Sequence, residues 1–380
     1  MKALGLIAEY NPMHFGHTYH IRESQALKKP DVTIVVMSGS VVQRGDFAMH
    51  DKWVRTHTAL HNGVDLVIEL PSFYVLQSAD YFAQASVDLL DQLHVSDLVF
   101  GSETGDLNPL KSLLALHQTS AFKAAVKAAS AEGLSYPDAM VKATQNADLK
   151  LGLTPNNILG LGYLKALNAL DSQINADTIK RTKRTYYAPL KKFQKIQSAT
   201  AIRTAINSGQ SAASYVPDPL SGVIDTAPTV RLADFYREFS YRLKMVDNAA
   251  FKHQFGFAEG LENRFLKAHH HATYFDFLEA VKTPRYTYAH INRAMMHFLL
   301  HTPAAFDAFD APPYIRILGM TKTGQAYLNH VKKDLHLPVY TSAKHGQHPL
   351  LDFEIKISQL IATKTNQDFA QKELNPPIRV

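Results

Sequence analysis

The stretch that decides the fold lies at the amino terminus, where residues 2–25 are KALGLIAEYNPMHFGHTYHIRESQ. The apolar run at residues 3–8 predicts a buried strand, and Asn11-Pro12 predicts a turn. A polar segment with helix-forming residues follows directly. A strand, a tight turn and a helix start together present backbone N–H groups to an anion. We therefore expect the rest of the chain to be organised around a phosphate-bearing nucleotide at this point.

Two histidines stand in that turn, within the sequence His14-Phe15-Gly16-His17. Their spacing of three residues predicts that both lie on one face of the first helical turn. Imidazole N–H groups there can donate to phosphate oxygens, and Gly16 removes a side chain, so that phosphates can approach the backbone. The alternative is a pair of histidines on a surface helix. The position directly after the first strand favours the phosphate site.

Composition limits the possible functions. The chain has 380 residues with 46% hydrophobic and 19% charged residues, which predicts a folded protein of one large or two smaller domains. The absence of cysteine excludes disulfides, zinc–thiolate sites and a cysteine nucleophile, and it is compatible with the cytoplasm. No apolar run approaches the length of about 18 residues needed to span a membrane. A net charge of +6 is compatible with a polyanionic partner.

Strand and helix signals alternate over the first hundred residues. Buried strands are expected at residues 3–8, 32–37, 65–70 and 97–100, and helices at 17–28, 51–61 and 79–92. This rhythm predicts an α/β fold with a Rossmann-like, doubly wound parallel sheet. Ligands of such sheets bind at the carboxyl ends of the strands. Those ends are residues 9–11, 38–44, 69–71 and 101–103.

The chain changes character beyond the first hundred residues. A helical insert is expected at 108–131, with Asn108 as its cap, and at 134–144, followed by a helix at 155–170 that Gly160 and Gly162 interrupt. A segment rich in Ser, Gly and Pro at 208–219 suggests a domain boundary. We expect a nucleotide-binding domain at 1–210 and a mainly helical domain at 211–380. A strand–helix–strand piece is expected at 314–340.

A second phosphate-binding candidate is Ser198-Ala-Thr-Ala-Ile-Arg203. Ser198 and Thr200, at a helix start, can cap the helix and donate to phosphate oxygens, and Arg203 can neutralise a leaving pyrophosphate. Taken alone, the segment favours an ordinary capped helix. Together with the histidine turn, it favours the phosphate site.

Two further segments have balanced interpretations. Residues 38–46, SGSVVQRGD, are either a substrate loop or a polar turn. A basic stretch with interleaved aromatic residues either holds an RNA backbone and stacks an unpaired base or forms a solvated surface. Its candidate RNA-binding residues are Lys183, Arg184, Lys191, Lys192 and Lys195.

Several long motifs occur in a characteristic order. They are GLIAEYNPMHFGHTYHI (5–21), MSGSVVQRGDFAMHDKWVR (37–55), NGVDLVIELP (62–71), LVFGSE (98–103), PNNILGLGYLKAL (155–167), SATAIR (198–203) and YIRILGMTKTGQAYL (314–328). The series resembles the bacterial tRNA(Met) cytidine acetate ligases, a branch of the HIGH-type nucleotidyltransferase superfamily. The resemblance covers most of the chain and is weakest over 205–310. Ser40-Val41-Val42 departs from the usual Asn-Phe-containing loop.

The resemblance implies a two-step reaction. ATP and acetate would form acetyl-adenylate and pyrophosphate, and the acetyl group would pass to N4 of the wobble cytidine of elongator tRNA(Met). Mg²⁺ is expected to bind together with ATP, and no metal site built from protein side chains is expected. Neither acetyl-CoA as a substrate nor a membrane as a partner is expected. The domain at 1–210 would then be a nucleotidyltransferase-like, ATP-binding catalytic domain, and the helical domain at 211–380 would contribute to tRNA binding. The basic residues between 183 and 195 would bind tRNA. His14 and His17 are the expected catalytic residues. The expected ATP contacts are Ile7, Ala8, Glu9, Tyr10, Asn11, Pro12, Met13, His14, Phe15, Gly16, His17, Thr18, Tyr19, His20, Gly101, Asn156 or Asn157, Arg181, Ser198, Thr200 and Arg203.

Two other functions fit parts of the pattern. A nucleotidyltransferase for a small phosphorylated metabolite would need only the histidine turn and SATAIR, but it would not explain the basic, helical C-terminal third. A nucleotide-binding scaffold without catalysis would not need the imidazoles of His14 and His17.

Overall fold

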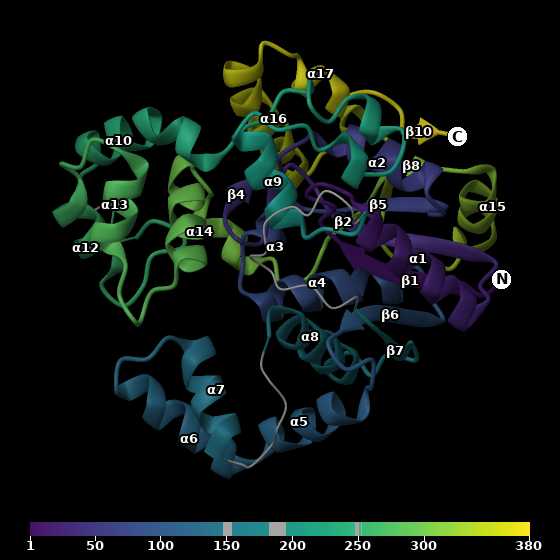
Figure 1. Ribbon diagram of the computed structural model, residues 1–380, viewed down its shortest axis with the longest axis horizontal. Helices are drawn as coiled ribbons and strands as arrows, with labels where there is room; N and C mark the ends of the chain where they lie inside the picture. The colour runs from purple at the N-terminus through teal and green to yellow at the C-terminus, as the bar shows by residue number, and fades with distance from the viewer. Residues whose placement is uncertain (147–153, 182–194, 248–250, 252) are drawn as a thin grey trace.

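The computed structural model describes residues 1–146, 154–181, 195–247, 251 and 253–380 (Figure 1). Its centre is an eight-stranded sheet with the order β10-β8-β5-β2-β1-β6-β7, in which β9 also pairs with β8. The strands are β1 Ala3–Ala8, β2 Val32–Ser38, β5 Leu66–Leu70, β6 Asp97–Ser102, β7 Asn175–Lys180, β8 Ile315–Met320, β9 Val339–Tyr340 and β10 Ile378–Arg379. The first four strands predicted from the sequence are confirmed.

The core strands are parallel and buried on both faces. β1 pairs with β2 and β6, β2 with β5, and β6 with β7, all in parallel. Along β2, Ile34 and Val36 belong to one hydrophobic cluster, whereas Val35 and Met37 belong to another. Because successive side chains of a strand point to opposite faces, the two clusters are the cores above and below the sheet. The unbroken apolar run of β2 had indicated this environment.

Helices cover both faces. Those of the first part of the sheet are α1 Phe15–Lys28, α2 Lys52–His61, α3 Ser72–Val75, α4 Ala79–Gln92 and α8 Pro155–Ala169. The expectation that Gly160 and Gly162 interrupt α8 was wrong, because the helix continues through both. A Cβ at Gly160 would lie 2.5 Å from Phe100, and one at Gly162 would lie 2.9 Å from Ala83. These glycines therefore allow close packing of α8 and are not breaks in it.

The insert after β6 forms a lobe of its own, with α5 Asn108–Gln118, α6 Ser120–Ala131 and α7 Tyr136–Asn146 (Figure 1). The single helix expected at 108–131 is divided at Thr119, whose side chain caps α6 by accepting a hydrogen bond from the Phe122 N–H. The expectation that Asn108 caps the insert was also wrong. Leu107 occupies the cap position and Asn108 is already helical.

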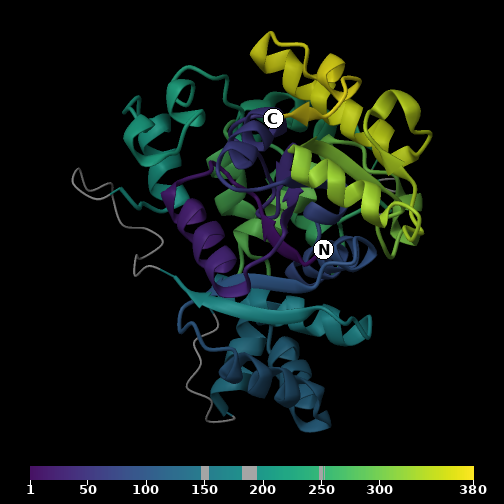
Figure 2. The same ribbon diagram turned by 90° about the vertical axis from the view of Figure 1, so that its right-hand side faces the viewer.

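The remaining helices come from the second half of the chain. They are α9 Ala199–Asn207, α10 Tyr236–Met245, α12 Leu261–Ala268, α13 Tyr274–Val281, α14 Tyr288–Leu299, α15 Lys322–Val331, α16 Pro349–Thr365 and α17 Phe369–Glu373. Short 3₁₀ turns are η1 Ala213–Tyr215, η2 Leu220–Gly222, η3 Leu232–Phe235, η4 Ala304–Ala308 and η5 Ala343–His345. Helices α10 and α12–α14 form a lobe beside the sheet, and Figure 2 shows α16 and α17 at the end opposite the α5–α7 lobe.

The sheet extends into the C-terminal part of the chain. β8 pairs antiparallel with β5, with Leu66 opposite Met320, and β10 and β9 pair in parallel with β8. The strand at 314–318 was predicted, but its place beside β5 and its antiparallel direction were not. The central sheet therefore draws strands from both sides of residue 210.

Candidate functional site

The histidine turn is built by reciprocal backbone capping. His14 is the N-cap of α1 in an extended conformation, and its Nδ1 accepts a hydrogen bond from the Gly16 N–H at 3.0 Å. In return, the His14 N–H donates to Nδ1 of His17 at 3.2 Å. The two rings stack with centroids 3.9 Å apart. The predicted pair is thus brought together, although His14 stands before the first helical turn and not within it.

The hydrogen bonds and burial together set the protonation of this pair. Burial, with smaller effects from Arg181 and Arg203, lowers the pKa of His14 to about 3. Burial and the neighbouring His14 and Arg181 also lower the pKa of His17 well below its usual value. A neutral imidazole whose Nδ1 accepts a hydrogen bond carries its proton on Nε2. Both rings therefore offer a fixed Nε2–H donor at neutral pH and no positive charge.

Gly16 has a second role that the sequence did not reveal. A Cβ at this position would lie 2.7 Å from Cε1 and 2.9 Å from Nδ1 of His14. A side chain would therefore push the His14 ring out of its capping position. The absence of a side chain at Gly16 therefore serves the orientation of the imidazole.

The SATAIR segment lies against the same turn. Ser198 caps α9 as predicted, accepting a hydrogen bond from the Ala201 N–H at 3.1 Å. Arg203 donates from Nη1 to the carbonyl oxygen of Asn11 at 2.6 Å and from Nη2 to Oγ1 of Thr200 at 3.2 Å. These bonds fix a guanidinium directly beside the loop between β1 and α1.

A third group comes from β6, α8 and the end of β7. Arg181 donates from Nη1 to Oδ1 of Asn156 at 2.6 Å, and Asn156 donates from Nδ2 to Oε1 of Glu103 at 2.9 Å. A Cβ at Gly101 would lie 3.0 Å from Cγ of Arg181. The sequence left Asn156 and Asn157 as alternatives. The structure places Asn156 beside Arg181, whereas Asn157 is only 2% exposed.

The loop between β1 and α1 is held by groups that sequence reasoning did not single out. Arg55 is fully buried on α2 and donates to the carbonyl oxygens of Glu9 at 2.7 Å and Ser38 at 2.9 Å, and also to that of Gly39. Oδ1 of Asn11 accepts a hydrogen bond from the Met49 N–H at 2.8 Å. Arg55 ends the motif at 37–55, but the motif did not indicate this role, because the partners of Arg55 are backbone carbonyls, which carry no sequence signal.

Residues 38–46, for which two interpretations were open, form the end of β2 and a small antiparallel hairpin of β3 Val41–Val42 and β4 Asp46–Phe47. Gly45 has a φ of +78°, and a Cβ there would lie 2.4 Å from the backbone N of Arg293 on α14. The Gln43 N–H donates to Oε1 of Glu9 at 2.7 Å, and the Gln43 carbonyl accepts from Arg293 at 3.2 Å. The hairpin thus joins the end of β1 to the helical lobe.

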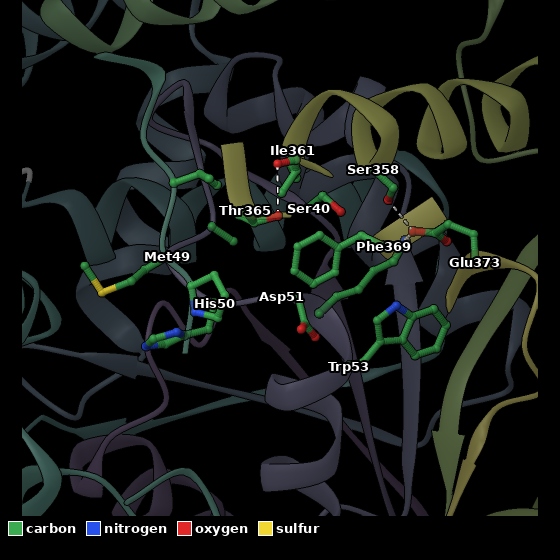
Figure 3. A pocket seen from close by; sticks show the side chains of 14 residues that line it. Ser40, Met49, His50, Asp51, Trp53, Ser358, Ile361, Thr365, Phe369 and Glu373 are labelled. Atoms are coloured by element: carbon green, nitrogen blue, oxygen red, sulfur yellow. Dashed lines mark hydrogen bonds and ion pairs between the residues drawn. The ribbon is translucent and has the colours of Figure 1, made fainter. Parts of the chain in front are cut away.

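A hollow of about 390 Å³, including its open mouth, lies behind the turn. Its lining comes from α2, α16, α17 and the chain around Pro228 and Val230. Figure 3 shows Asp51, Trp53 and Phe369 grouped together, with Met49 and His50 towards the other end. The hollow adjoins the candidate site through Met49, whose backbone N–H binds Asn11.

Buried ion pairs close the floor of this hollow. Nζ of Lys52 lies 2.5 Å from Oε1 of Glu69 and 2.7 Å from Oε1 of Glu373, and all three side chains are at most 1% exposed. Arg316 also pairs with Glu373 at 3.2 Å. Lys52 is therefore neutralised within the core and is not an open cation of the hollow.

Most of the expected tRNA-binding residues, Lys183, Arg184, Lys191 and Lys192, lie outside the described residues. The exception, Lys195, places its Nζ 5.8 Å from the ring centre of Phe15, next to the histidine turn. Over the described ranges, no three His, Asp or Glu side chains are grouped to hold a metal ion. In the same part of the chain, no helix combines the length and apolarity needed to cross a bilayer.

Known proteins share both the sequence and the arrangement. A family model described as HIGH Nucleotidyl Transferase matches residues 1–375. The tRNA(Met) cytidine acetate ligases of Bacillus licheniformis and Caldicellulosiruptor saccharolyticus are 37% and 38% identical to this chain, covering 95% and 96% of it and 92% and 94% of their own lengths. The chain belongs to the tRNA(Met) cytidine acetate ligase branch of the HIGH nucleotidyltransferases. The resemblance drawn from the motifs is thereby confirmed.

Solved structures of this family extend the match to the fold. Thermotoga maritima TmcAL bound with alpha-thio ATP is 29% identical to this chain, with a TM-score of 0.89 over 100% of this chain and 99% of that one. The apo form of the same protein gives a TM-score of 0.90 at 28% identity, with 100% of both chains covered. The Rossmann-like α/β class expected from the sequence is confirmed.

Proposed function

We propose that this protein is an ATP-dependent ligase that forms acetyl-adenylate from ATP and acetate. It then transfers the acetyl group to N4 of the wobble cytidine of elongator tRNA(Met). The observation that carries this proposal is the stacked pair His14 and His17, which presents two neutral N–H donors near the charges of Arg181 and Arg203. Support comes from the family membership and from the alpha-thio ATP bound to the T. maritima protein.

In the first step, an acetate oxygen attacks the α-phosphorus, and pyrophosphate leaves with the electrons of the broken P–O bond. Acetate is an anion at neutral pH, so this step needs charge compensation and in-line positioning and no strong base. The Nε2–H groups of His14 and His17 would donate to phosphate oxygens, and Arg181 and Arg203 would offset the developing charge. The proposed adenosine triphosphate contacts remain those of the segment from Ile7 to His20 together with Gly101, Asn156, Ser198 and Thr200.

Mg²⁺ would accompany ATP. The described residues offer no group of three metal-binding side chains, so oxygens of the triphosphate and water would be its main ligands.

In the second step, the cytosine amine attacks the acetyl carbonyl carbon and AMP leaves. The base must be unstacked to reach the anhydride, and water must be kept away from it. The basic stretch that ends at Lys195 would contact the tRNA backbone, and the helical lobe of the 211–380 region would add to this surface. A tRNA substrate fits a cytoplasmic location for this protein. We also expect that acetate, and not acetyl-CoA, supplies the acetyl group.

The deciding experiment has two measurements on the purified protein. The first is exchange of labelled pyrophosphate into ATP with and without acetate. The second is mass spectrometry of nucleosides from tRNA(Met) incubated with ATP and either acetate or acetyl-CoA. We expect exchange that requires acetate and acetylcytidine that forms with acetate. Absence of acetate-dependent exchange would overturn the adenylation step, and exchange supported by a phosphorylated metabolite in place of acetate would favour the metabolite nucleotidyltransferase.

A further inference from the structure

Acetyl transfer to an amine needs a proton acceptor. The N4 lone pair forms a bond to the acetyl carbonyl carbon, and the carbon–oxygen bond to the AMP phosphate breaks, its electron pair leaving on the phosphate oxygen. One proton of the amine must then go to a base, since the product amide nitrogen is neutral. The identity of this base rests on the proposed function and is a separate question from adenylation.

The histidines of the turn are unsuited to accept this proton. Nδ1 of His14 and Nδ1 of His17 already accept backbone hydrogen bonds, and in the neutral rings each Nε2 carries a proton. The unpaired Nε2 of His20, one turn further along α1, is sealed from solvent. These rings can donate to phosphates, but none presents an open lone pair to a substrate amine.

Glu9 has the open lone pair that the histidines lack. It lies at the carboxyl end of β1, is half-buried, and precedes the histidine turn directly in the chain. Its backbone carbonyl is held by Arg55 at 2.7 Å and its Oε1 by the Gln43 N–H at 2.7 Å. Among the described residues, Oε2 of Glu9 makes no hydrogen bond, and it is not sealed from solvent. One carboxylate oxygen is therefore fixed while the other is available.

One oxygen of each of the other nearby carboxyl groups is also held, as in Glu9, but these groups do not lie at the end of β1. Oδ1 of Asp46 accepts hydrogen bonds from the Leu232 and Phe47 N–H groups at 2.6 and 2.8 Å, which fixes it in the hairpin. Oε1 of Glu103 accepts from Asn156 and so supports the Arg181 side of the site. Neither combines an open oxygen with the end of β1.

We propose that the Glu9 carboxylate accepts the proton that N4 of cytidine loses during acetyl transfer. Glu9 begins the loop between β1 and α1, and the histidine donors stand at its other end. One segment would thus serve both steps, with the imidazoles on the phosphates and the carboxylate on the incoming amine.

The surroundings of Glu9 are suited to this task. Burial raises its pKa, while the hydrogen bond from Gln43 and the charges of Arg203, Arg44 and Arg55 oppose the rise. The charge of Glu9 in turn raises the pKa of Tyr163 on α8, in addition to the larger effect of burial. A raised pKa makes a carboxylate a stronger base toward the proton of an amine.

The test separates the two steps in the full-length protein. Enzyme-bound acetyl-adenylate is formed from ATP and acetate and then mixed with tRNA(Met) in a single turnover. For Glu9→Gln, in which the amide oxygen still accepts from Gln43, we expect the transfer rate to fall by about 100-fold or more and acetate-dependent exchange by less than about 10-fold. Wild-type transfer should rise with pH to a plateau, and the variant should lose this dependence. Glu9→Asp should recover part of the rate and the pH dependence.

Asp46→Asn is the matched control, since it removes the other carboxylate of the region and should keep pH-dependent transfer. Transfer by Glu9→Gln at the wild-type rate, or an equal loss of exchange and transfer, would overturn the assignment and leave the proposed function intact. If Glu9→Gln does not fold, the pH dependence of the transfer rate decides. A wild-type rate that does not change with pH would overturn the assignment of Glu9. A wild-type rate that rises with pH to a plateau, over a pH range that Glu9→Asp shifts, would support it. A wild-type protein without acetate-dependent exchange would instead remove the proposed function, and this inference with it.

Discussion

The backbone N–H of His14 donates to Nδ1 of His17 at 3.2 Å, and the two imidazoles stack 3.9 Å apart at the start of α1. This bond and its counterpart from Gly16 to His14 settle which nitrogen of each ring faces outward as a donor. A protonated ring could not accept either bond. The turn therefore works with neutral imidazoles, and arginines supply its positive charge.

Replacing His17 by alanine should remove one phosphate donor and half of the reciprocal cap. We expect His17→Ala to lower acetate-dependent pyrophosphate exchange by about 100-fold or more, the usual loss for a donor to developing charge. His330→Ala, at an exposed position of α15, is the control and should keep full exchange. Undiminished exchange in His17→Ala would show that the ring does not act on the phosphates.

Gly16→Ala tests the steric role of the glycine. The added methyl group would lie 2.7 Å from the His14 ring, so the ring must leave its capping position. We expect exchange to fall by roughly 10-fold or more, although no hydrogen-bonding side chain is removed. Gly222→Ala adds the same methyl group where no atom lies within 4 Å, and it should leave exchange unchanged. Equal activity of the two variants would contradict the steric account.

Lys52→Met tests the ion pairs beneath the hollow. Loss of the ammonium leaves the buried carboxylates of Glu69 and Glu373 without their shared cation. We expect the free energy of unfolding to fall by about 3–5 kcal/mol, as is typical when one partner of a buried pair is removed. Lys142→Met breaks an exposed pair with Glu132 and should cost less than about 1 kcal/mol. Denaturant unfolding of both variants gives the comparison, and similar losses would argue against a structural role for the buried network.

Glu354 should make stability depend on pH. Burial and the nearby Glu69 raise its pKa from 4.5 to about 8. Between these values the unfolded chain has lost the proton that the native state retains, so the contribution of Glu354 to stability is complete below pH 4.5 and is lost as the pH rises through 8. Its carboxyl group binds the N–H and hydroxyl of Ser72, and a glutamine can make both bonds without a charge.

We therefore expect Glu354→Gln to gain stability relative to the wild type on going from pH 5 to pH 8, by about 1 kcal/mol or more. Thermal unfolding across this range measures the difference. Glu23→Gln, at an exposed position on α1, should follow the wild-type curve. A Glu354→Gln curve parallel to the wild type would show that Glu354 is ionised in the native state throughout.

The sequence predicted the parts of the molecule that depend on local patterns. The apolar run of β2 indicated burial on both faces, and Ser198 marked the start of α9. Arg181 meets Asn156 and not Asn157, and that contact exists only in the folded chain. Arg55 could not be predicted because it binds backbone carbonyls. The ion pair between Lys52 and Glu373 joins residues near opposite ends of the chain, a separation over which no spacing rule applies.

The place of β8 has a consequence for how the molecule forms. β5, which carries the buried Glu69 at its end, is flanked by β2 on one side and by β8 on the other. Because β8 comes from residues 315–320, β5 would remain an open edge on the ribosome until most of the chain has been made. In a fragment ending near residue 210, the edge of β5 would stay unpaired because β8 is missing. Lys52 would pair with Glu69 alone, because Glu373 is missing too. The sheet of the N-terminal half is thus completed by β8 and by the carboxylate of Glu373, which are made late. A truncated gene product would be prone to aggregate through the exposed edge of β5.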